Sequence, residues 1–481
     1  MDDAHIVNEE TSLLPAAKRR SKPNPLPWLQ ISIILLLQVC EPIAALSIYP
    51  YINQLISELD ITGGDERKVG YYAGLVESLF FATEAITVLQ WSRISDHVGR
   101  KPILLIGLMG LSLSMISFGL SRTFLTLILS RCLCGLLNGN IGVMKSVMGE
   151  LTDSTNRAEG FSLMPVVWAT GATLGPLMGG TLSKPHERFP NLFGGSFWKE
   201  YPYLLPCLAT SSLVIVAFFI TLIFFKETIP KKNHRRKTTI SEDGVILDGP
   251  IPAEDQPLPL RKLLVYPVVI SVSNYMTLAF LNISLNALMP LFFAMPVTIG
   301  GLGFDPPTIG YIMGAYGSFT GLFQAFFFAK IIHYLGERRI FVWGMLTFLP
   351  IFMIFPMMSQ YAQNFGVTPV IYTMIGIMLA LMAFMDMAFG CIFMFITASA
   401  PNKRSLGATN GLSQTTVSIA RAIGPAMSTS LFSLSVQRNL LGGYAVYAIL
   451  FGLSCLAMIL AVQLPQEMWE EADDHICHET L

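Results

Sequence analysis

Long apolar stretches separated by shorter polar segments dominate the chain. Twelve of them come close to the roughly 20 residues that a helix needs to cross the hydrocarbon core of a bilayer. They lie at about 27–49, 69–91, 102–120, 123–145, 160–182 and 203–225, and then at 264–290, 307–329, 340–358, 369–396, 407–433 and 441–463. The pattern predicts an all-α membrane protein with twelve transmembrane helices in two six-helix bundles.

The polar segments divide the chain into five parts. We expect an N-terminal tail at 1–26, a first six-helix bundle at 27–226, a linker at 227–263, a second six-helix bundle at 264–464 and an acidic tail at 465–481. The linker contains the run KKNHRRK and several prolines. It is too charged to enter a bilayer and too poor in apolar periodicity to pack as a domain. The linker and both tails are therefore expected in the cytosol.

Composition and charge agree with this picture. Of the 481 residues, 52% are hydrophobic and 13% are charged, whereas soluble domains have about 25% charged residues. With the N-terminus inside, 22 of the 31 Lys and Arg residues lie on the cytosolic side and 7 lie outside, as the positive-inside rule requires. The net charge of -1 offers no basic stripe for nucleic acid. The sequence has no GxxxxGK loop for ATP, which argues against an ATP-driven pump.

The two halves share weak internal similarity. WSRISDHVGRKPILLIG joins the second and third spans, and FAKIIHYLGERRIFVWG joins the eighth and ninth; aligning Gly99 with Gly336 gives an offset of 237 residues. GATLGPLMGG in span five likewise corresponds to RAIGPAMSTS in span eleven. Two six-span halves with such symmetry are typical of transporters in which one bundle rocks against the other.

Several motifs resemble the major facilitator superfamily. The stretch from Ser92 to Lys101 resembles the family's loop motif GxxxDxxGRR/K, with Ser92 in the place of the first glycine. RCLCGLLNG resembles the fourth-span motif, and GATLGPLMGG resembles the fifth-span motif of antiporters, with Ser162 replacing its most distant glycine. CEPIAALSIYPYI and NGLSQTTVSIARAIGPA narrow the resemblance to the zinc-induced-facilitator-like group, relatives of tetracycline/proton antiporters. The resemblance implies transport of metal chelators, organic acids, cations or drugs.

The loop at 91–102 is interpreted as a gating loop. Gly99 suits a position with positive φ in a tight turn. Asp96 is expected to face a helix N-terminus of the other half, while Arg100 and Lys101 pair with nearby acids. The alternative is that the basic residues only enforce topology.

The fifth-span motif predicts close helix packing. Gly171, Gly175 and Gly179 share one helix face, where small residues let another backbone approach; Gly180 follows them. Pro176 is expected to bend the helix. Whether this face gates transport or only packs is left open by the sequence.

Polar side chains inside the apolar spans mark a candidate cavity. Lipid does not solvate such groups, so they should face water or the opposite bundle. The candidates are Gln38, Asn138, Asn282, Asn286, Asn410, Gln414, Ser418 and Arg421. Methionines around Asp386 are interpreted as core filling rather than a metal site, and HICH at 475–478 as a solvated tail. No metal and no cofactor are expected.

Glu41, followed by Pro42, is the leading candidate for proton coupling. On a helix that begins near Trp28 it lies roughly 20 Å into the membrane, where an unpaired carboxylate is costly. Pro42 frees a carbonyl towards a polar cavity. Arg131 is the expected counter-charge, and Glu77, Glu84 and Asp386 are reserve candidates. A paired acid that only holds the bundle together is the structural alternative.

These features favour a secondary active transporter, not an enzyme, that exchanges protons for a small organic solute, drug or metal chelate. Two alternatives stay open: a facilitator or uniporter of the same fold, and a receptor or chaperone that no longer transports. We expect a monomer in the lipid bilayer. The stretch EETSLLP, with Glu9, Leu13 and Leu14, fits an acidic dileucine sorting motif read by adaptor proteins. It indicates the vacuolar or lysosomal membrane, with the plasma membrane as the alternative.

Replacing Leu13 and Leu14 by alanine should move the protein to the plasma membrane without changing its folding, because the motif is an address and not an anchor. Fluorescence microscopy of the tagged double variant measures this, with Leu26→Ala, outside the motif, as a control. Identical distributions of the double variant and the parent would reject the sorting role.

Overall fold

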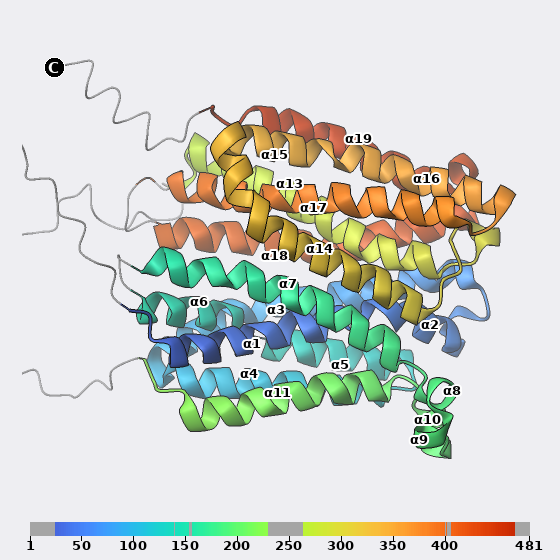
Figure 1. Cartoon of the computed structure of the whole chain (residues 1–481), viewed down its shortest axis with the longest axis horizontal. Helices are drawn as coiled ribbons and strands as arrows, with labels where there is room; N and C mark the ends of the chain where they lie inside the picture. Colours follow the sequence, from blue (N-terminus) through green and yellow to red (C-terminus); the bar gives the residue numbers. More distant parts are fainter. Residues whose placement is uncertain are drawn as a thin grey trace, which may run out of the picture.

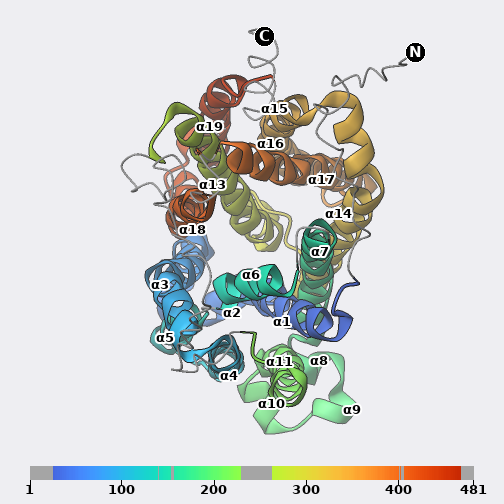
Figure 2. The same cartoon turned by 90° about the vertical axis from the view of Figure 1, so that its left-hand side faces the viewer.

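The computed structural model describes residues 25–138, 140–152, 156–228, 263–399, 401 and 406–466. Within these ranges the chain is almost entirely helical and contains no strand. The long helices run side by side (Figure 1). Viewed along the helices, the first six segments lie on one side and the last six on the other (Figure 2). The predicted all-α fold of twelve long segments in two bundles is confirmed, whereas Glu9, Leu13, Leu14 and residues 467–481 of the acidic tail lie outside the described residues.

Three of the twelve segments are broken into two helices. The first bundle consists of α1 with α2 (Trp28–Leu46 and Tyr49–Glu58), α3 (Val69–Val98), α4 (Arg100–Gly119), α5 with α6 (Phe124–Leu137 and Asn140–Leu151), α7 (Arg157–Leu182) and α11 (Leu204–Phe224). The second bundle consists of α13 (Tyr266–Ala294), α14 (Pro306–Leu335), α15 with α16 (Glu337–Leu346 and Phe348–Phe365), α17 (Pro369–Ala398), α18 (Leu406–Gln437) and α19 (Ala445–Val462).

The two ends of the molecule differ. At one end, here called the linker end, lie Gly99, Gly336 and Thr228, the last described residue before the central linker. At the other, the loop end, the short helices α8 (Pro185–Arg188), α9 (Pro190–Phe193) and α10 (Ser196–Glu200) lie between α7 and α11 (Figure 1). Assignment of the linker end to the cytosol stays a prediction from the charge count.

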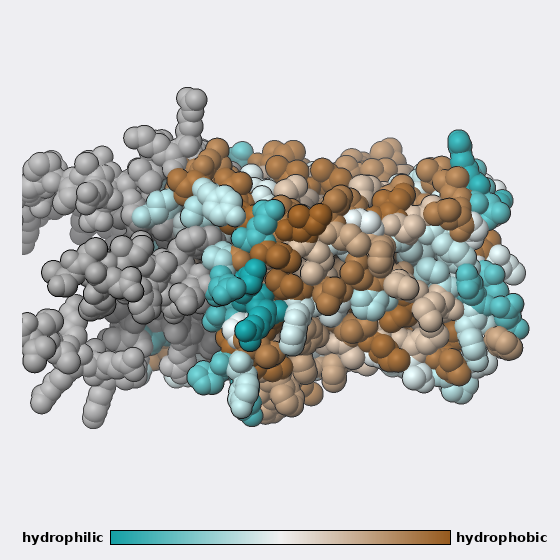
Figure 3. Space-filling view, turned by 90° about the horizontal axis from the view of Figure 1, so that it is seen from above, coloured by the Kyte–Doolittle hydropathy of each residue, from teal (hydrophilic) through white to brown (hydrophobic). Residues whose placement is uncertain are grey.

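The outer surface suits a bilayer. In the described ranges, eight helical segments are long and apolar enough to cross a membrane. On the face seen in Figure 3, a broad apolar band lies between more polar ends. The other four segments, α3, α7, α14 and α18, are less apolar. They contact one another across the two bundles, α7 with α14 and α3 with α18, so protein rather than lipid covers their polar and small residues.

The gating loop is shorter than the sequence predicts. Helices α3 and α4 are separated only by Gly99, so most of 91–102 is helical and not a ten-residue loop. Gly99 has φ +112°, which confirms the expected positive φ. Gly336 separates α14 from α15 in the same way, with φ +76°. A single glycine reverses the chain at both sites because it has no Cβ to clash at positive φ.

The internal duplication extends to side-chain contacts. Lys101 Nζ donates to Phe225 O at 2.8 Å, beyond the last turn of α11. Arg338, which is 237 residues after Lys101, donates from Nε to Leu464 O at 2.6 Å and from Nη2 to Val462 O at 2.7 Å, at the end of α19. Each bundle therefore uses a cation after its glycine turn to satisfy free carbonyls at the end of its last helix.

Helix breaks occur where the sequence weakens the backbone ladder. The break between α1 and α2 follows Pro42 by about one turn. The break between α5 and α6 falls at Asn138, within an Asn-Gly pair that favours turns. Asn138 therefore lies just outside the helix that carries Arg131 and Cys134, since α5 ends at Leu137.

Arg338→Gln should lower the stability of the second bundle, because charge-assisted hydrogen bonds each contribute about 1.5–3 kcal/mol and the variant loses two. Because Arg338 is only partly buried, we expect the loss of unfolding free energy to lie at the lower end of that range. Thermal unfolding of the purified protein in detergent measures it. Arg339→Gln, the exposed neighbouring arginine, is the matched control, and equal melting temperatures for the two variants would contradict the capping role.

Candidate functional site

Two acidic residues of the first bundle share one amide. Asn138, at the break after α5, donates through Nδ2 to Glu41 Oε1 on α1 at 3.3 Å and to Glu84 Oε1 on α3 at 3.0 Å. Glu84 is buried and Glu41 is half-buried. The break that removes Asn138 from the helix gives its side chain access to both acids. Three separate chain segments thus build one carboxylate pair in the interior of the bundle.

Arg131 lies beside this pair. The side chain is buried, and its guanidinium lies over the ring of Phe80 with 4.7 Å between Cζ and the ring centroid. The centroid of the Phe118 ring lies 6.0 Å from the same Cζ atom. Among the described residues, Arg131 Nε has no hydrogen-bond partner. Arg131 and Glu41 line the same small pocket, together with Phe80, Cys134 and Asn138. The role of Arg131 as counter-charge stays a prediction.

A second acid of α3 has a tyrosine partner. Tyr49, at the start of α2, donates its hydroxyl to Glu77 Oε1. Both side chains are buried. Tyr49 was not among the site residues predicted from the sequence. Its position eight residues after Glu41, on the same face of a continuous helix, was the available signal.

The second bundle repeats this pairing. Asp386 on α17 accepts a hydrogen bond from the hydroxyl of Tyr316 on α14, a partner that the sequence analysis missed. On α13, Asn286 Nδ2 donates to Asn282 Oδ1 at 3.0 Å, and Asn282 Nδ2 lies 3.7 Å from Met385 Sδ. Spans seven and ten therefore meet at Asn282 and Met385, whereas Asp386 has its partner on α14.

The remaining cavity candidates lie further apart. On α18, Asn410 is exposed near the linker end, while Gln414, Ser418 and Arg421 are half-buried. Arg421 lies on α18, which packs across the bundle boundary on α3. Gln38 is half-buried, and its Oε1 has no hydrogen-bond partner among the described residues. No group of metal-ligating side chains occurs in the ranges that the structure describes.

The glycine motif of α7 packs on two neighbours. A Cβ added at Gly171, Gly175 or Gly179 would come within 3.0 Å of α1 between Pro42 and Ser47. A Cβ at Gly180 would lie 2.5 Å from Pro306 O on α14 of the other bundle. The expected close approach of another backbone is therefore confirmed. Pro176 lies at the same contact, with its carbonyl oxygen 2.5 Å from a Cβ added at Gly310.

The two bundles touch in the half of the molecule near the loop end. Gly70 and Gly74 of α3 lie against Thr429 of α18, and Ala426 N donates to Ser78 Oγ at 2.9 Å. On the other side, Gly310, Gly314, Gly317 and Gly321 of α14 lie against α7. Closer to the linker end the same helices expose large side chains, including Ile86, Trp168, Leu322, Phe326 and Ile419. The contact helices thus pack closely on one another near the loop end, and more of their side-chain surface is exposed near the linker end.

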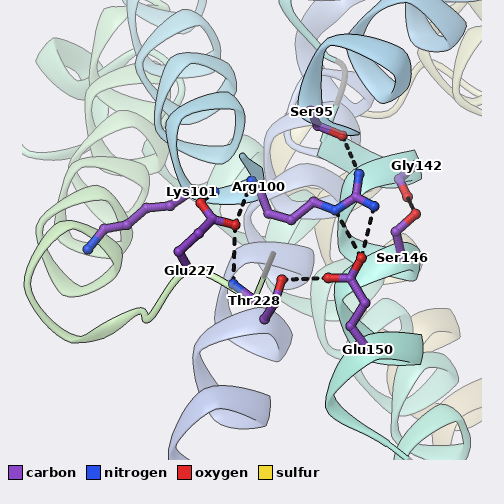
Figure 4. A network of polar contacts seen from close by, with 8 residues as sticks. All are labelled: Ser95, Arg100, Lys101, Gly142, Ser146, Glu150, Glu227 and Thr228. Carbon is purple, nitrogen blue, oxygen red and sulfur yellow. Dashed lines mark hydrogen bonds and ion pairs between the residues drawn. The ribbon is translucent and has the colours of Figure 1, made fainter. Parts of the chain in front are cut away.

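Arg100 forms the centre of a polar network at the linker end (Figure 4). Its Nε and Nη2 donate to Glu150 Oε1 at 3.2 and 2.9 Å, and Nη1 donates to Ser95 Oγ. Thr228 donates its hydroxyl to the other oxygen of Glu150. The predicted pairing of Arg100 with an acid is confirmed. It ties the ends of α3, α4 and α6 to the start of the linker.

Glu227 caps α4. Its two carboxylate oxygens accept from the backbone N–H groups of Arg100 and Lys101 at 2.8 and 3.0 Å, which suits the positive end of a helix dipole. The prediction that the Lys101 side chain pairs with an acid is wrong, because its ammonium donates to a carbonyl instead. The side chain of Asp96 lies outside the described side chains.

Comparisons with known proteins agree with this architecture. The Major Facilitator Superfamily model matches residues 34–425. The chain is 32% identical over 482 residues to the major facilitator-type transporter psiT2 of Psilocybe cyanescens, across 92% of this chain and 91% of that protein. It is 26% identical over 451 residues to the protein Zinc induced facilitator-like 1 of Arabidopsis thaliana, across 90% and 91% of the two chains. The predicted resemblance to that group is confirmed.

A solved structure supports the fold. The crystal structure of a D-xylose-proton symporter superposes with a TM-score of 0.68 at 12% identity, over 92% of this chain and 99% of that one. At this identity the likeness concerns the fold alone. The family match covers most of the chain, so the chain belongs to the Major Facilitator Superfamily and is a multi-pass membrane transporter, not an enzyme.

Proposed function

We propose that this protein is a proton-coupled antiporter that exchanges protons for a small organic solute by alternating access. The observation that carries the proposal is the pair of acids, Glu41 and Glu84, that shares the amide of Asn138 inside the first bundle. An acid at this depth has no structural need to be an acid, because an amide or a small apolar residue fills the same space at lower cost.

The geometry of the pair favours binding of a single proton. Two carboxylates that accept from one amide group repel each other, and burial strengthens this repulsion. A proton on either oxygen relieves it, and the net charge of the pair is then balanced by Arg131 alone. Loss of the proton leaves two negative charges, which need a second cation or a cationic solute.

Arg421 supplies a link between the proton and the conformational change. It lies on α18 of the second bundle, and α18 packs directly on α3, the helix that carries Glu84. Rocking of the bundles changes the distance between Arg421 and Glu84, and therefore the strength of their electrostatic attraction. The charge state of the pair and the relative position of the bundles are in this way coupled, as antiport requires.

The arrangement of contacts supports an assignment of the conformation. The bundles are closed near the loop end, and the side chains of the contact helices are exposed near the linker end. With the linker in the cytosol, as the charge count predicts, this is an inward-facing state. The opposite state needs the glycine contacts near the loop end to separate.

The solute is proposed to be small, organic and partly apolar. Phe80 lines the pocket of Glu41. In the second bundle, Tyr316 contacts Asp386, and Met385 lies beside the Asn282 amide of α13. Such a mixed lining binds apolar bodies and orients a few polar groups. A drug or metal chelate fits this description too. The acidic dileucine stretch supports placement in the vacuolar or lysosomal membrane.

Vesicles that contain the full-length protein test the proposal. They are loaded from an extract of small solutes in the presence and absence of an imposed pH gradient, and mass spectrometry identifies what accumulates. Accumulation that depends on the gradient is expected. Accumulation that ignores the gradient would identify a uniporter, and no accumulation of any solute would favour a receptor.

Glu41→Gln should fold and bind the solute yet lose accumulation driven by the pH gradient, because a neutral amide does not bind and release a proton as a carboxyl group does. Solute counterflow, which needs no net proton movement, should persist. Uptake and counterflow are measured side by side in the same vesicles. Glu187→Gln, in the exposed loop between α7 and α11, is the matched control. Normal gradient-driven uptake by Glu41→Gln would place the proton elsewhere.

Gly180→Leu should weaken closure at the loop end, because the new side chain cannot fit against Pro306 and Gly310. Overpacking costs about 1–3 kcal/mol, which corresponds to a shift of roughly 5–150-fold between the two states. Labelling of Ala73→Cys in a cysteine-free protein, by an impermeant maleimide added at the loop end, reports this shift.

Gly452→Leu is the control for that substitution, since nothing lies within 4 Å of a Cβ added at Gly452. It adds the same side chain to α19 without touching the boundary between the bundles. Equal labelling rates for the two leucine variants would show that the contact at Gly180 does not hold the loop end closed.

A further inference from the structure

Two acidic clusters lie at different depths along α3. Glu77 and Glu84 are seven residues apart, which is about 10 Å along a helix. Glu84 belongs to the cluster with Glu41 and Asn138, and Glu77 belongs to the cluster with Tyr49. Since α3 runs from the loop end to the linker end, the Glu77 cluster is the one closer to the loop end.

Arg131 connects the two clusters. It lines the pocket that contains Glu41 and Asn138, and it lines a second pocket that contains Tyr49 and Glu77. Its Nε has no hydrogen-bond partner among the described residues. The buried guanidinium of Arg131 therefore lies between the two acidic clusters, and its positive charge balances whichever acid is ionised.

The pocket at Glu77 reaches the second bundle. Its wall includes Ala287 and Pro290 of α13 and Thr429 of α18. Asn53 of α2 also lines it, and the buried Nδ2 of Asn53 lacks a hydrogen-bond partner within the described part of the chain. A pocket with two unpaired donors, a carboxyl group and a hydroxyl group is suited to water and protons rather than to an apolar side chain.

The contacts that close the loop end lie beside this pocket. Gly70 and Gly74 of α3 are packed on Thr429, which is also part of the pocket wall. Separation of α3 from α18 removes that wall and exposes Glu77 to the loop-end side. By contrast, Glu84 and Asn410 lie towards the linker end, where the same two helices are less covered.

We propose that Glu77, with Tyr49, is a second proton-binding site that exchanges protons with the loop-end side, while Glu41 and Glu84 exchange them with the linker-end side. This inference rests on the proposed proton coupling and adds a route to it. The proton leaves the carboxyl group of Glu77 as the bundles rock, and it reaches a carboxylate of the Glu41 and Glu84 pair. One O–H bond breaks at Glu77 and one forms at the pair, so charge is conserved.

Tyr49 has a specific part in this route. Its hydroxyl donates to Glu77 when that acid is ionised, which stabilises the deprotonated state until a new proton arrives. Besides Glu77, the charged side chain that lines this pocket is Arg131 from α5. On α18, Arg421 lies about two turns from the pocket residue Thr429. From α13 the pocket is faced by Ala287 and Pro290, which do not titrate.

The test uses Glu77→Gln and Tyr49→Phe in full-length protein reconstituted in vesicles in one orientation. The probe is the solute that wild-type vesicles accumulate most strongly from the extract. Its flux is measured while the pH is varied on one side at a time. Tyr51→Phe is the matched control, because Tyr51 is buried in the same helix but contacts Cys207 and Tyr203 instead.

We expect Glu77→Gln to lose the dependence of flux on the loop-end pH and to keep its dependence on the linker-end pH. Glu41→Gln should show the reverse, Tyr49→Phe should shift the loop-end profile to higher pH because the carboxylate loses a donor, and Tyr51→Phe should match wild type. A Glu77→Gln variant that keeps a wild-type response to loop-end pH would overturn the second site. Flux of the wild type that ignores pH on both sides would instead overturn the proposed function.

A second measurement decides the matter if Glu77→Gln does not fold. Dicyclohexylcarbodiimide reacts with protonated carboxyl groups in apolar surroundings, and mass spectrometry locates the adduct in wild-type protein. Glu77 should be labelled in a pH-dependent manner, and it should react with the carbodiimide more readily in Gly180→Leu than in wild type. Glu58, whose carboxylate pairs with Lys184 Nζ at 2.6 Å, should stay unlabelled. Absence of an adduct on Glu77 at every pH would overturn the proposal.

Discussion

The cost of placing a carboxylate inside a bilayer governs this structure. An ionised acid in hydrocarbon loses its hydration, and the protein has to replace it with donors or with a proton. Glu84 has the Asn138 amide, Glu77 has the Tyr49 hydroxyl and Asp386 has the Tyr316 hydroxyl. Each donor is neutral, so none of these acids is locked into a fixed ion pair with it. A neutral partner accepts either protonation state, which is what a transporter that loads and unloads a proton requires.

The same constraint explains which helices meet at the boundary between the bundles. Helices α3, α7, α14 and α18 are less apolar than the other spans, and their glycines let them approach one another closely. Backbone contacts through glycine involve few interlocking side chains, so they separate without repacking a core. The polar residues and the small residues therefore serve one purpose: a boundary that excludes lipid and can still open.

The glycine motif of α7 joins two parts of the molecule that the acids depend on. On one side it packs on α1 directly after Glu41, at Pro42, and on the other it packs on α14 of the second bundle. A movement of α14 relative to α7 therefore reaches the segment that carries Glu41 through a contact with little slack. At the linker end, Arg100, Glu150 and Glu227 hold the ends of the first bundle together as one body, so that the bundle moves as a unit.

The sequence alone determined the features that depend on neighbouring residues along one chain. Apolar length predicted the spans, positive φ suited Gly99, and the spacing of Gly171, Gly175 and Gly179 predicted a close helix contact. The partners across helices were decided only by tertiary structure: Tyr49 with Glu77, Tyr316 with Asp386, and Asn138 between two acids. Likewise, the ammonium of Lys101 met a carbonyl and not an acid. Helical periodicity fixes which residues share a face, but the rotation and depth at which two faces meet depend on packing that no local pattern encodes.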